Sequence, residues 1–262
     1  MPTSEFQIIN EDFEIELAAI IELVKNFAGK GQSPKISIAA ANSSTLLLAA
    51  TFEEFVRDMA RTYARAVVTN ATSLDKLPKN LASTAWKRSL ESLARVKFDI
   101  EQAAREKLTI DAQARFAVVF EFIKGDLSKD IYNDLIHNEN NMRPAQINSL
   151  FKISGLQDIC KSISDKEDIL SFFGEIESGK AHGKMLNGIN DFFERRNGIA
   201  HALNIRQSSG PDKIITDLEM LRAFGVALYK TLDALAPSPA TAIAAGTAPV
   251  QPADPTQAAL QG

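Results

Sequence analysis

The residues best suited to chemistry lie close together in the last third of the chain. The string Arg195-Arg196-Asn197-Gly198-Ile199-Ala200-His201 gathers two guanidinium groups, an amide and an imidazole. Asn197 and His201 are four residues apart, so on a helix they share a face that the long side chain of Arg196 can also reach. Arginine binds phosphate oxygens in pairs, an amide orients the bound group, and histidine transfers protons near neutral pH. The grouping therefore suits cleavage of a phosphodiester.

Spacing alone leaves two alternatives open. Arg195 also precedes His201 at a suitable distance, although Asn197 directly after Arg196 favours Arg196 as the residue that faces the site. An arginine and a histidine near the end of a helix can equally stabilise the negative end of the helix dipole. The catalytic interpretation needs support beyond the spacing.

The remaining candidate groups predict no metal and no cofactor. His137 lies in a polar segment that is typical of a solvated helix end, and His182 lies in segment 179–183, which we expect to be a surface loop. Phosphate binding by His182 is the less favoured alternative. Cys160 is the single cysteine, so neither an intrachain disulfide nor a cysteine-based zinc cage can form. No phosphate-binding glycine loop is present.

Composition limits the class of protein. The 262 residues carry a formal charge of -4 with 45% hydrophobic and 24% charged residues, which is ordinary for a chain with a buried core. Such a chain does not coat nucleic acid by bulk charge, but a local basic patch remains possible. The candidates for that patch are Lys180, Lys184, Arg195, Arg196 and Arg206. A solvated charged face is the alternative.

No segment predicts membrane insertion or secretion. Purely apolar runs such as Leu46–Ala50 are far shorter than the ~20 residues of a spanning helix. Segment 1–16 is acidic and lacks the basic region and apolar core of a secretory signal. We therefore expect a cytoplasmic protein without membrane contact.

Apolar periodicity predicts an all-α fold. The one strand candidate, segment 35–38, is too isolated to build a sheet. Segment 236–262 is rich in alanine and proline and predicts a flexible tail. We expect an N-terminal helix and connector over 1–42, a helical domain over 43–235 and the tail over 236–262. The expected helices span 11–28, 43–69, about 81–108, 111–124, a stretch ending at 137, a helix beginning at Arg143-Pro144, 166–176, 184–196 and 213–235.

Three segments together resemble the HEPN superfamily. The block Arg196-Asn197-Gly198-Ile199-Ala200-His201 is similar to its signature of an arginine, a polar residue and then a histidine. Segment 46–56, an apolar run that leads into Phe52-Glu53, resembles the first core helix of these domains. Segment 140–144, followed by Leu150-Phe151 and Gly155, resembles the RiboL-PSP-HEPN branch. The resemblance covers about 43–235, and neither the first helix nor the tail has a recognised counterpart.

The resemblance implies a homodimeric helical bundle that cuts RNA without a metal. It assigns phosphate binding to Arg196, orientation of the phosphate or the imidazole to Asn197 and proton transfer to His201, in a cleft between protomers. The attacking group would be the ribose 2′-hydroxyl, which DNA lacks. Arg195, Lys184 and Arg206 would contact the RNA, and Glu53 has either an accessory or a purely structural role.

Several biological roles are compatible with this resemblance. The leading hypothesis is a ribonuclease that acts as a toxin or a phage-defence effector, with an antitoxin or a defence-system protein as partner. The main alternative is a non-catalytic HEPN-like module that dimerises or binds nucleotides for a partner protein. A third is regulation by a partner that nucleotidylates or phosphorylates the chain near its motif.

Overall fold

The chain folds into α-helices. A computed structural model of the chain describes residues 3–27, 31, 33–95, 101–136, 141–201 and 209–237, with residue 104 as backbone only. Within these ranges there is no strand, so the all-α prediction is confirmed; the expected tail beyond residue 237 lies outside the described residues. The helices are α1 Glu5–Phe27, α2 Pro34–Thr69, a 3-10 helix Leu74–Lys76, α3 Lys79–Ala94, α4 Gln102–Ile123, α5 Tyr132–Leu135, α6 Pro144–Ile153, α7 Ile159–Ile163, α8 Glu167–Phe173, α9 Ser178–His201 and α10 Pro211–Leu235.

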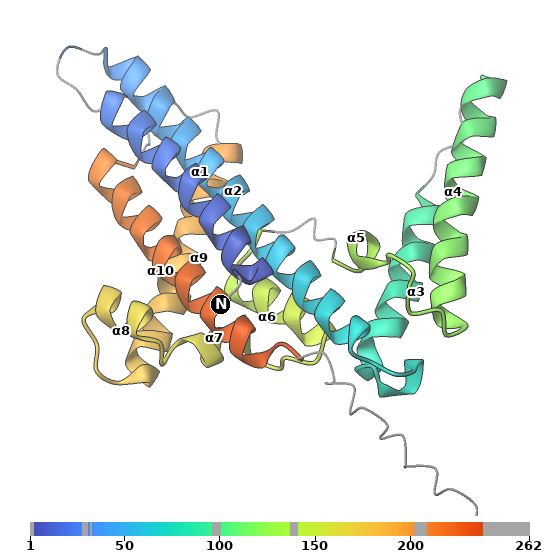
Figure 1. Cartoon of the computed structure of the whole chain (residues 1–262). Helices are drawn as coiled ribbons and strands as arrows, with labels where there is room; N and C mark the ends of the chain where they lie inside the picture. Colours follow the sequence, from blue (N-terminus) through green and yellow to red (C-terminus); the bar gives the residue numbers. More distant parts are fainter. Residues whose placement is uncertain are drawn as a thin grey trace, which may run out of the picture.

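Three long helices, α1, α2 and α10, lie side by side and form the main body (Figure 1). The fully buried ring of Phe52 lies at the centre of this body. It meets Phe224 of α10 edge-on at a centroid distance of 5.4 Å, and it lies 6.3 Å from the ring of Phe193 of α9. On the α1 side, Phe13 stacks on Phe55 at 4.2 Å. These contacts fix α9 and α10 against α2.

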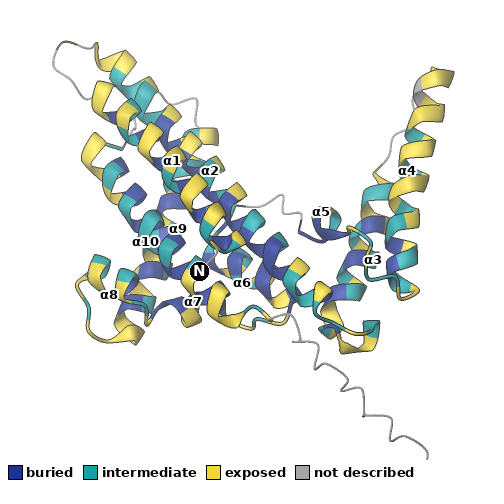
Figure 2. Ribbon diagram, viewed as in Figure 1, coloured by how far each residue is buried: buried dark blue, intermediate teal, exposed yellow. Residues whose placement is uncertain are grey.

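Helices α3 and α4 form a pair at the far end of α2, away from the main body (Figure 1). The Trp86 and Phe116 rings meet at 5.5 Å between these two helices. Most of α4 is exposed along its N-terminal half (Figure 2). No helix among the described residues is long and apolar enough to cross a membrane.

Helices α1 and α2 begin earlier than the sequence indicates. Helix α1 begins at Glu5, because the Ser4 hydroxyl accepts a hydrogen bond from the Gln7 backbone amide and Phe6 is buried. Helix α2 begins at Pro34, where Ser33 is the N-cap. The isolated strand candidate, segment 35–38, is therefore the first turn of α2, and residue 43 lies inside this helix. The division into segments 1–42, 43–235 and 236–262 stays a prediction.

Other boundaries also differ from expectation. Helix α3 ends at Ala94 and α4 begins at Gln102, whereas we expected one helix to run from 81 to 108; segment 95–101 contains no glycine or proline that would signal a break. Helix α9 begins at Ser178, so segment 179–183 is helical and the expected surface loop is wrong. Ala181, Met185 and Ile189 are buried at four-residue intervals, and this packing outweighs the weak helix propensity of the glycines. The predicted start of α6 at Arg143-Pro144 is confirmed.

Candidate active site

The last turns of α9 carry the predicted motif. Phe192 and Phe193 are fully buried, which fixes the orientation of the helix just before the motif begins. We expected this helix to end at residue 196, but it continues to His201 without interruption, so Asn197 and His201 lie one turn apart on the same face. His201 is exposed and bonds to no described residue. Its imidazole is therefore available to an incoming group.

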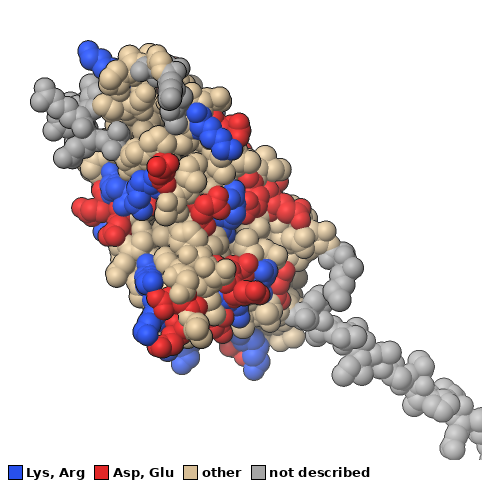
Figure 3. Space-filling model, turned by 90° about the vertical axis from the view of Figure 1, so that its left-hand side faces the viewer, with Lys and Arg blue, Asp and Glu red and all other residues tan. Residues whose placement is uncertain are grey.

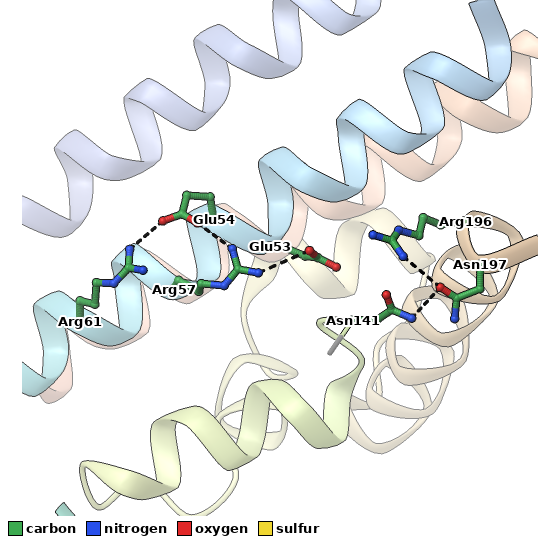
Figure 4. Close-up of polar contacts among 7 residues, drawn as sticks. All are labelled: Glu53, Glu54, Arg57, Arg61, Asn141, Arg196 and Asn197. Carbon is green, nitrogen blue, oxygen red and sulfur yellow. Dashed lines mark hydrogen bonds and ion pairs between the residues drawn. The ribbon is translucent and has the colours of Figure 1, made fainter. Parts of the chain in front are cut away.

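Arg196 and Asn197 belong to a polar cluster with a residue far away in sequence. The Nη1 of Arg196 donates to the Oδ1 of Asn197 at 3.2 Å, and the Nδ2 of Asn141 donates to the same oxygen at 2.7 Å. Asn141 lies just before α6, 56 residues away from Asn197 along the chain. Figure 4 shows the three side chains facing one another. The cluster presents a guanidinium and an amide, and the amide of Asn197 lies one helical turn before His201.

Glu53 of α2 lies between Arg57 and Arg196 (Figure 4). Its side chain is only 12% exposed, and its Oε2 is 3.5 Å from an Nη2 of Arg57. Burial raises the pKa of the Glu53 carboxyl, and the positive charges of Arg196 and Arg57 and the Met142 backbone amide oppose that rise. The buried carboxylate of Glu53 can thus balance the positive charge of Arg196 although the two side chains form no direct ion pair.

Arg195 points to a different part of the molecule. Its Nη2 lies 2.6 Å from the Oδ2 of Asp217 in α10, and Lys213 Nζ lies 2.6 Å from the other carboxylate oxygen. The Asp217 side chain is only 3% exposed. Arg195 thus joins α9 to α10, whereas Arg196 forms no ion pair with a described residue. The two neighbouring arginines have different surroundings, and Arg196 is the one in the cluster with Asn197.

The other predicted basic residues do not gather around His201 in the described part of the chain. Lys184 lies 2.6 Å from Glu175 and donates to the Phe173 carbonyl, and Lys180 pairs with Glu177 at 3.0 Å. Arg206 and His137 lie outside the described residues. Figure 3 shows positive and negative side chains intermixed on one face of the body. A role of Lys184, Arg195 and Arg206 in RNA binding stays a prediction.

The remaining candidate groups lie away from the motif. Half-buried His182 lies early in α9, with a buried Nε2 that has no hydrogen-bond partner among the described residues. Cys160 is buried, and burial raises the pKa of its thiol to about 12. Among the described residues, no three His, Cys, Asp or Glu side chains are grouped closely enough to hold a metal ion.

Comparison with known proteins identifies the family. The model of the RiboL-PSP-HEPN family matches residues 11–234. The chain belongs to the RiboL-PSP-HEPN family. The match begins inside α1 and ends one residue before the end of α10. The family model therefore includes most of α1, the first helix, which we expected to have no counterpart in the family. No curated protein and no solved structure matches this RiboL-PSP-HEPN chain. The matched range contains the motif on α9, and HEPN families are typically ribonucleases.

Asn141 is the site residue that sequence reasoning missed. The segment that contains it resembled the RiboL-PSP-HEPN branch, but no spacing rule connects position 141 with position 197. The one available signal was this resemblance to the family segment. The contact depends on how the segment before α6 packs on α9, which only the tertiary structure reveals.

Proposed function

We propose that this protein is a metal-independent endoribonuclease whose active site contains Arg196, Asn197 and His201. The observation that carries the proposal is that these three side chains are grouped in the last turns of α9. Arg196 and Asn197 form one hydrogen-bonded pair, and the exposed His201 follows one turn after Asn197. Membership of a family typical of ribonucleases supports the same conclusion.

The proposed chemistry begins with binding of the scissile phosphate. The Arg196 guanidinium and the Asn197 amide donate to its nonbridging oxygens, where negative charge builds up as phosphorus becomes five-coordinate. One His201 imidazole accepts the proton of the ribose 2′-hydroxyl, whose oxygen forms the new bond to phosphorus. The bond to the 5′-oxygen breaks, and that oxygen takes up a proton from an imidazolium. The products are a 2′,3′-cyclic phosphate and a 5′-hydroxyl.

The proposed site is completed by a second copy of the chain. One His201 acts as base and its two-fold copy acts as acid, so each protomer supplies half of the proton transfer. Glu53 has an accessory role in this scheme, because its carboxylate balances the charge of Arg196 when no RNA is bound. Arg195, Lys184 and Arg206 are proposed to contact the RNA at a greater distance. We further propose that the enzyme acts as a toxin or a phage-defence effector.

The test compares RNA with DNA of the same sequence, in EDTA. The proposal predicts cleavage of RNA alone, with products that end in a 2′,3′-cyclic phosphate. An RNA that carries a single 2′-deoxynucleotide at the mapped cleavage site should resist cleavage at that site and no other. Cleavage of the DNA, or of the 2′-deoxy position, would contradict the proposed attack by the 2′-hydroxyl.

A further inference from the structure

The segment before α6 is attached to α9 by two side-chain contacts. Asn141 donates to Asn197, and Arg143 Nη2 lies 2.8 Å from the Oε2 of Glu194, one turn earlier on α9. Met142, between them, is fully buried, and the Arg143 amide donates to the Asn141 carbonyl at 2.8 Å. Residue 141 is therefore held in a defined position relative to the motif.

The chemistry of the contacts defines the orientation of the Asn197 amide. A guanidinium can donate hydrogen bonds but cannot accept them, so the Asn197 atom that faces Arg196 must be the oxygen. The same oxygen is 2.7 Å from the Asn141 side chain, so Asn141 must present its NH2 group. Both acceptor sites of the Asn197 oxygen are then occupied. The NH2 group of Asn197 is the end that remains, and it donates to no described residue.

We propose that Asn141 is a positioning residue that makes Asn197 present a hydrogen-bond donor, and not an acceptor, to the anionic substrate. This proposal rests on the proposed ribonuclease function. The two ends of an amide have almost the same shape, so the oxygen and the NH2 group exchange places easily when no neighbour distinguishes them. Arg196 supplies one such neighbour, but it is also the group that binds phosphate. Asn141 keeps the oxygen turned inward when Arg196 moves to the substrate.

Replacing Asn141 with Asp tests the orientation with a small change in shape. The aspartate accepts and cannot donate, so it can bind Arg196 in place of the Asn197 oxygen and attract the NH2 group of Asn197, which turns that oxygen toward the substrate. We expect cleavage to fall about 100-fold, the size of effect seen when one donor to a developing oxyanion is lost. Asn141→Ala removes the contact without reversing it, and about a tenfold loss is expected.

Asn148 of α6 provides a matched control. It donates to Asp158 at 2.8 Å and accepts from the Cys160 amide at 3.0 Å, so it is an equally well bonded asparagine outside the candidate site. Asn148→Ala should lower stability but leave cleavage per folded molecule within about threefold. In an Asn197→Asp background the outward donor is already absent, so Asn141→Ala should have no further effect on cleavage.

A second readout does not depend on cleavage. NMR of ¹⁵N-labelled asparagine detects the Asn197 side-chain NH2, which is assigned by its loss in Asn197→Asp. This group should exchange rapidly with water in the wild type and in Asn148→Ala, and slowly in Asn141→Asp, where the carboxylate binds it. Unchanged exchange in Asn141→Asp, or cleavage by Asn141→Asp equal to that of Asn148→Ala, would overturn the proposal. If the wild type does not cleave RNA, the ribonuclease function fails and the exchange rates alone decide the orientation.

Discussion

Two neighbouring arginines should respond in opposite ways to the same substitution. Arg195→Gln and Arg196→Gln each replace a guanidinium with a neutral amide, at adjacent positions of α9. The first removes a contact to the buried Asp217, and the second removes a cation from the cluster with Asn197. We expect Arg195→Gln to affect stability and Arg196→Gln to affect cleavage.

The size of the stability effect follows from the surroundings of Asp217. Its side chain is 3% exposed and has two cationic partners, each at 2.6 Å. Breaking a buried pair outright costs about 3–5 kcal/mol, but Lys213 remains and the Arg195 side chain is 29% exposed, so a loss of about 2 kcal/mol is expected. For a domain of this size, that corresponds to a fall in Tm of roughly 4–8 °C. Arg196→Gln should change the free energy of unfolding by less than about 1 kcal/mol.

The effect on cleavage should have the reverse order. Loss of a donor that stabilises charge on the transferring phosphate lowers the rate by about 10²–10³, so Arg196→Gln should be nearly inactive. Arg195→Gln should lower cleavage per folded molecule by no more than about tenfold, because Arg195 is proposed to contact the RNA away from the reacting phosphate. Urea unfolding followed by circular dichroism gives the first quantity, and cleavage in EDTA gives the second. A nearly inactive but stable Arg195→Gln, beside an active Arg196→Gln, would refute the assignment of Arg196 to the site.

Three further predictions test particular groups. Burial raises the pKa of the Glu53 carboxyl, so the folded state binds the carboxyl proton more tightly than the unfolded state does. The charged carboxylate therefore destabilises the folded state at a pH above the folded-state pKa. This cost disappears at a pH below the ordinary pKa of glutamate, where the carboxyl is protonated in both states. Glu53→Gln should therefore increase resistance to urea at about pH 7.5, with a gain that fades as the pH falls through the acidic range; a gain that grows on acidification would contradict this. With a thiol pKa of about 12, Cys160 should react with iodoacetamide at least 100-fold more slowly in the native protein than in urea, and rapid native alkylation would show that it is accessible. Gly155 has a φ of +101°, so Gly155→Ala should lower the free energy of unfolding by about 1–2 kcal/mol. Gly183 lies in α9 with open space where a Cβ would be added, so Gly183→Ala should raise the free energy of unfolding by about 0.5–1 kcal/mol. Equal effects of the two substitutions would contradict the argument from backbone conformation.

The sequence was sufficient to predict the helical class and the family. Apolar side chains at helical spacing identify helices such as α1 and α10, and the Arg143-Pro144 pair marks the start of α6. The beginning of α9 was missed, because the glycines at 179 and 183 weaken the local helical signal. Burial of Ala181 and Met185 stabilises that turn through contacts that periodicity does not reveal.

The surroundings of the motif could not be predicted from spacing. Arg195 and Arg196 differ by about 100° around the helix axis, which is enough to direct one to Asp217 and the other to the Asn197 cluster. Either arginine satisfies the sequence pattern, and the choice depends on where α10 and the segment before α6 pack. The same packing brings Asn141 to Asn197 and places Glu53 between Arg57 and Arg196.

The most direct test of the active-site assignment is a cleavage assay of His201→Ala on total RNA in EDTA. His182→Ala is the matched control, because it removes an imidazole from the same helix away from the motif. We predict that wild type and His182→Ala cleave RNA, while folded His201→Ala loses at least about 100-fold in rate. Equal cleavage by all three proteins, or none by a folded wild type, would contradict it.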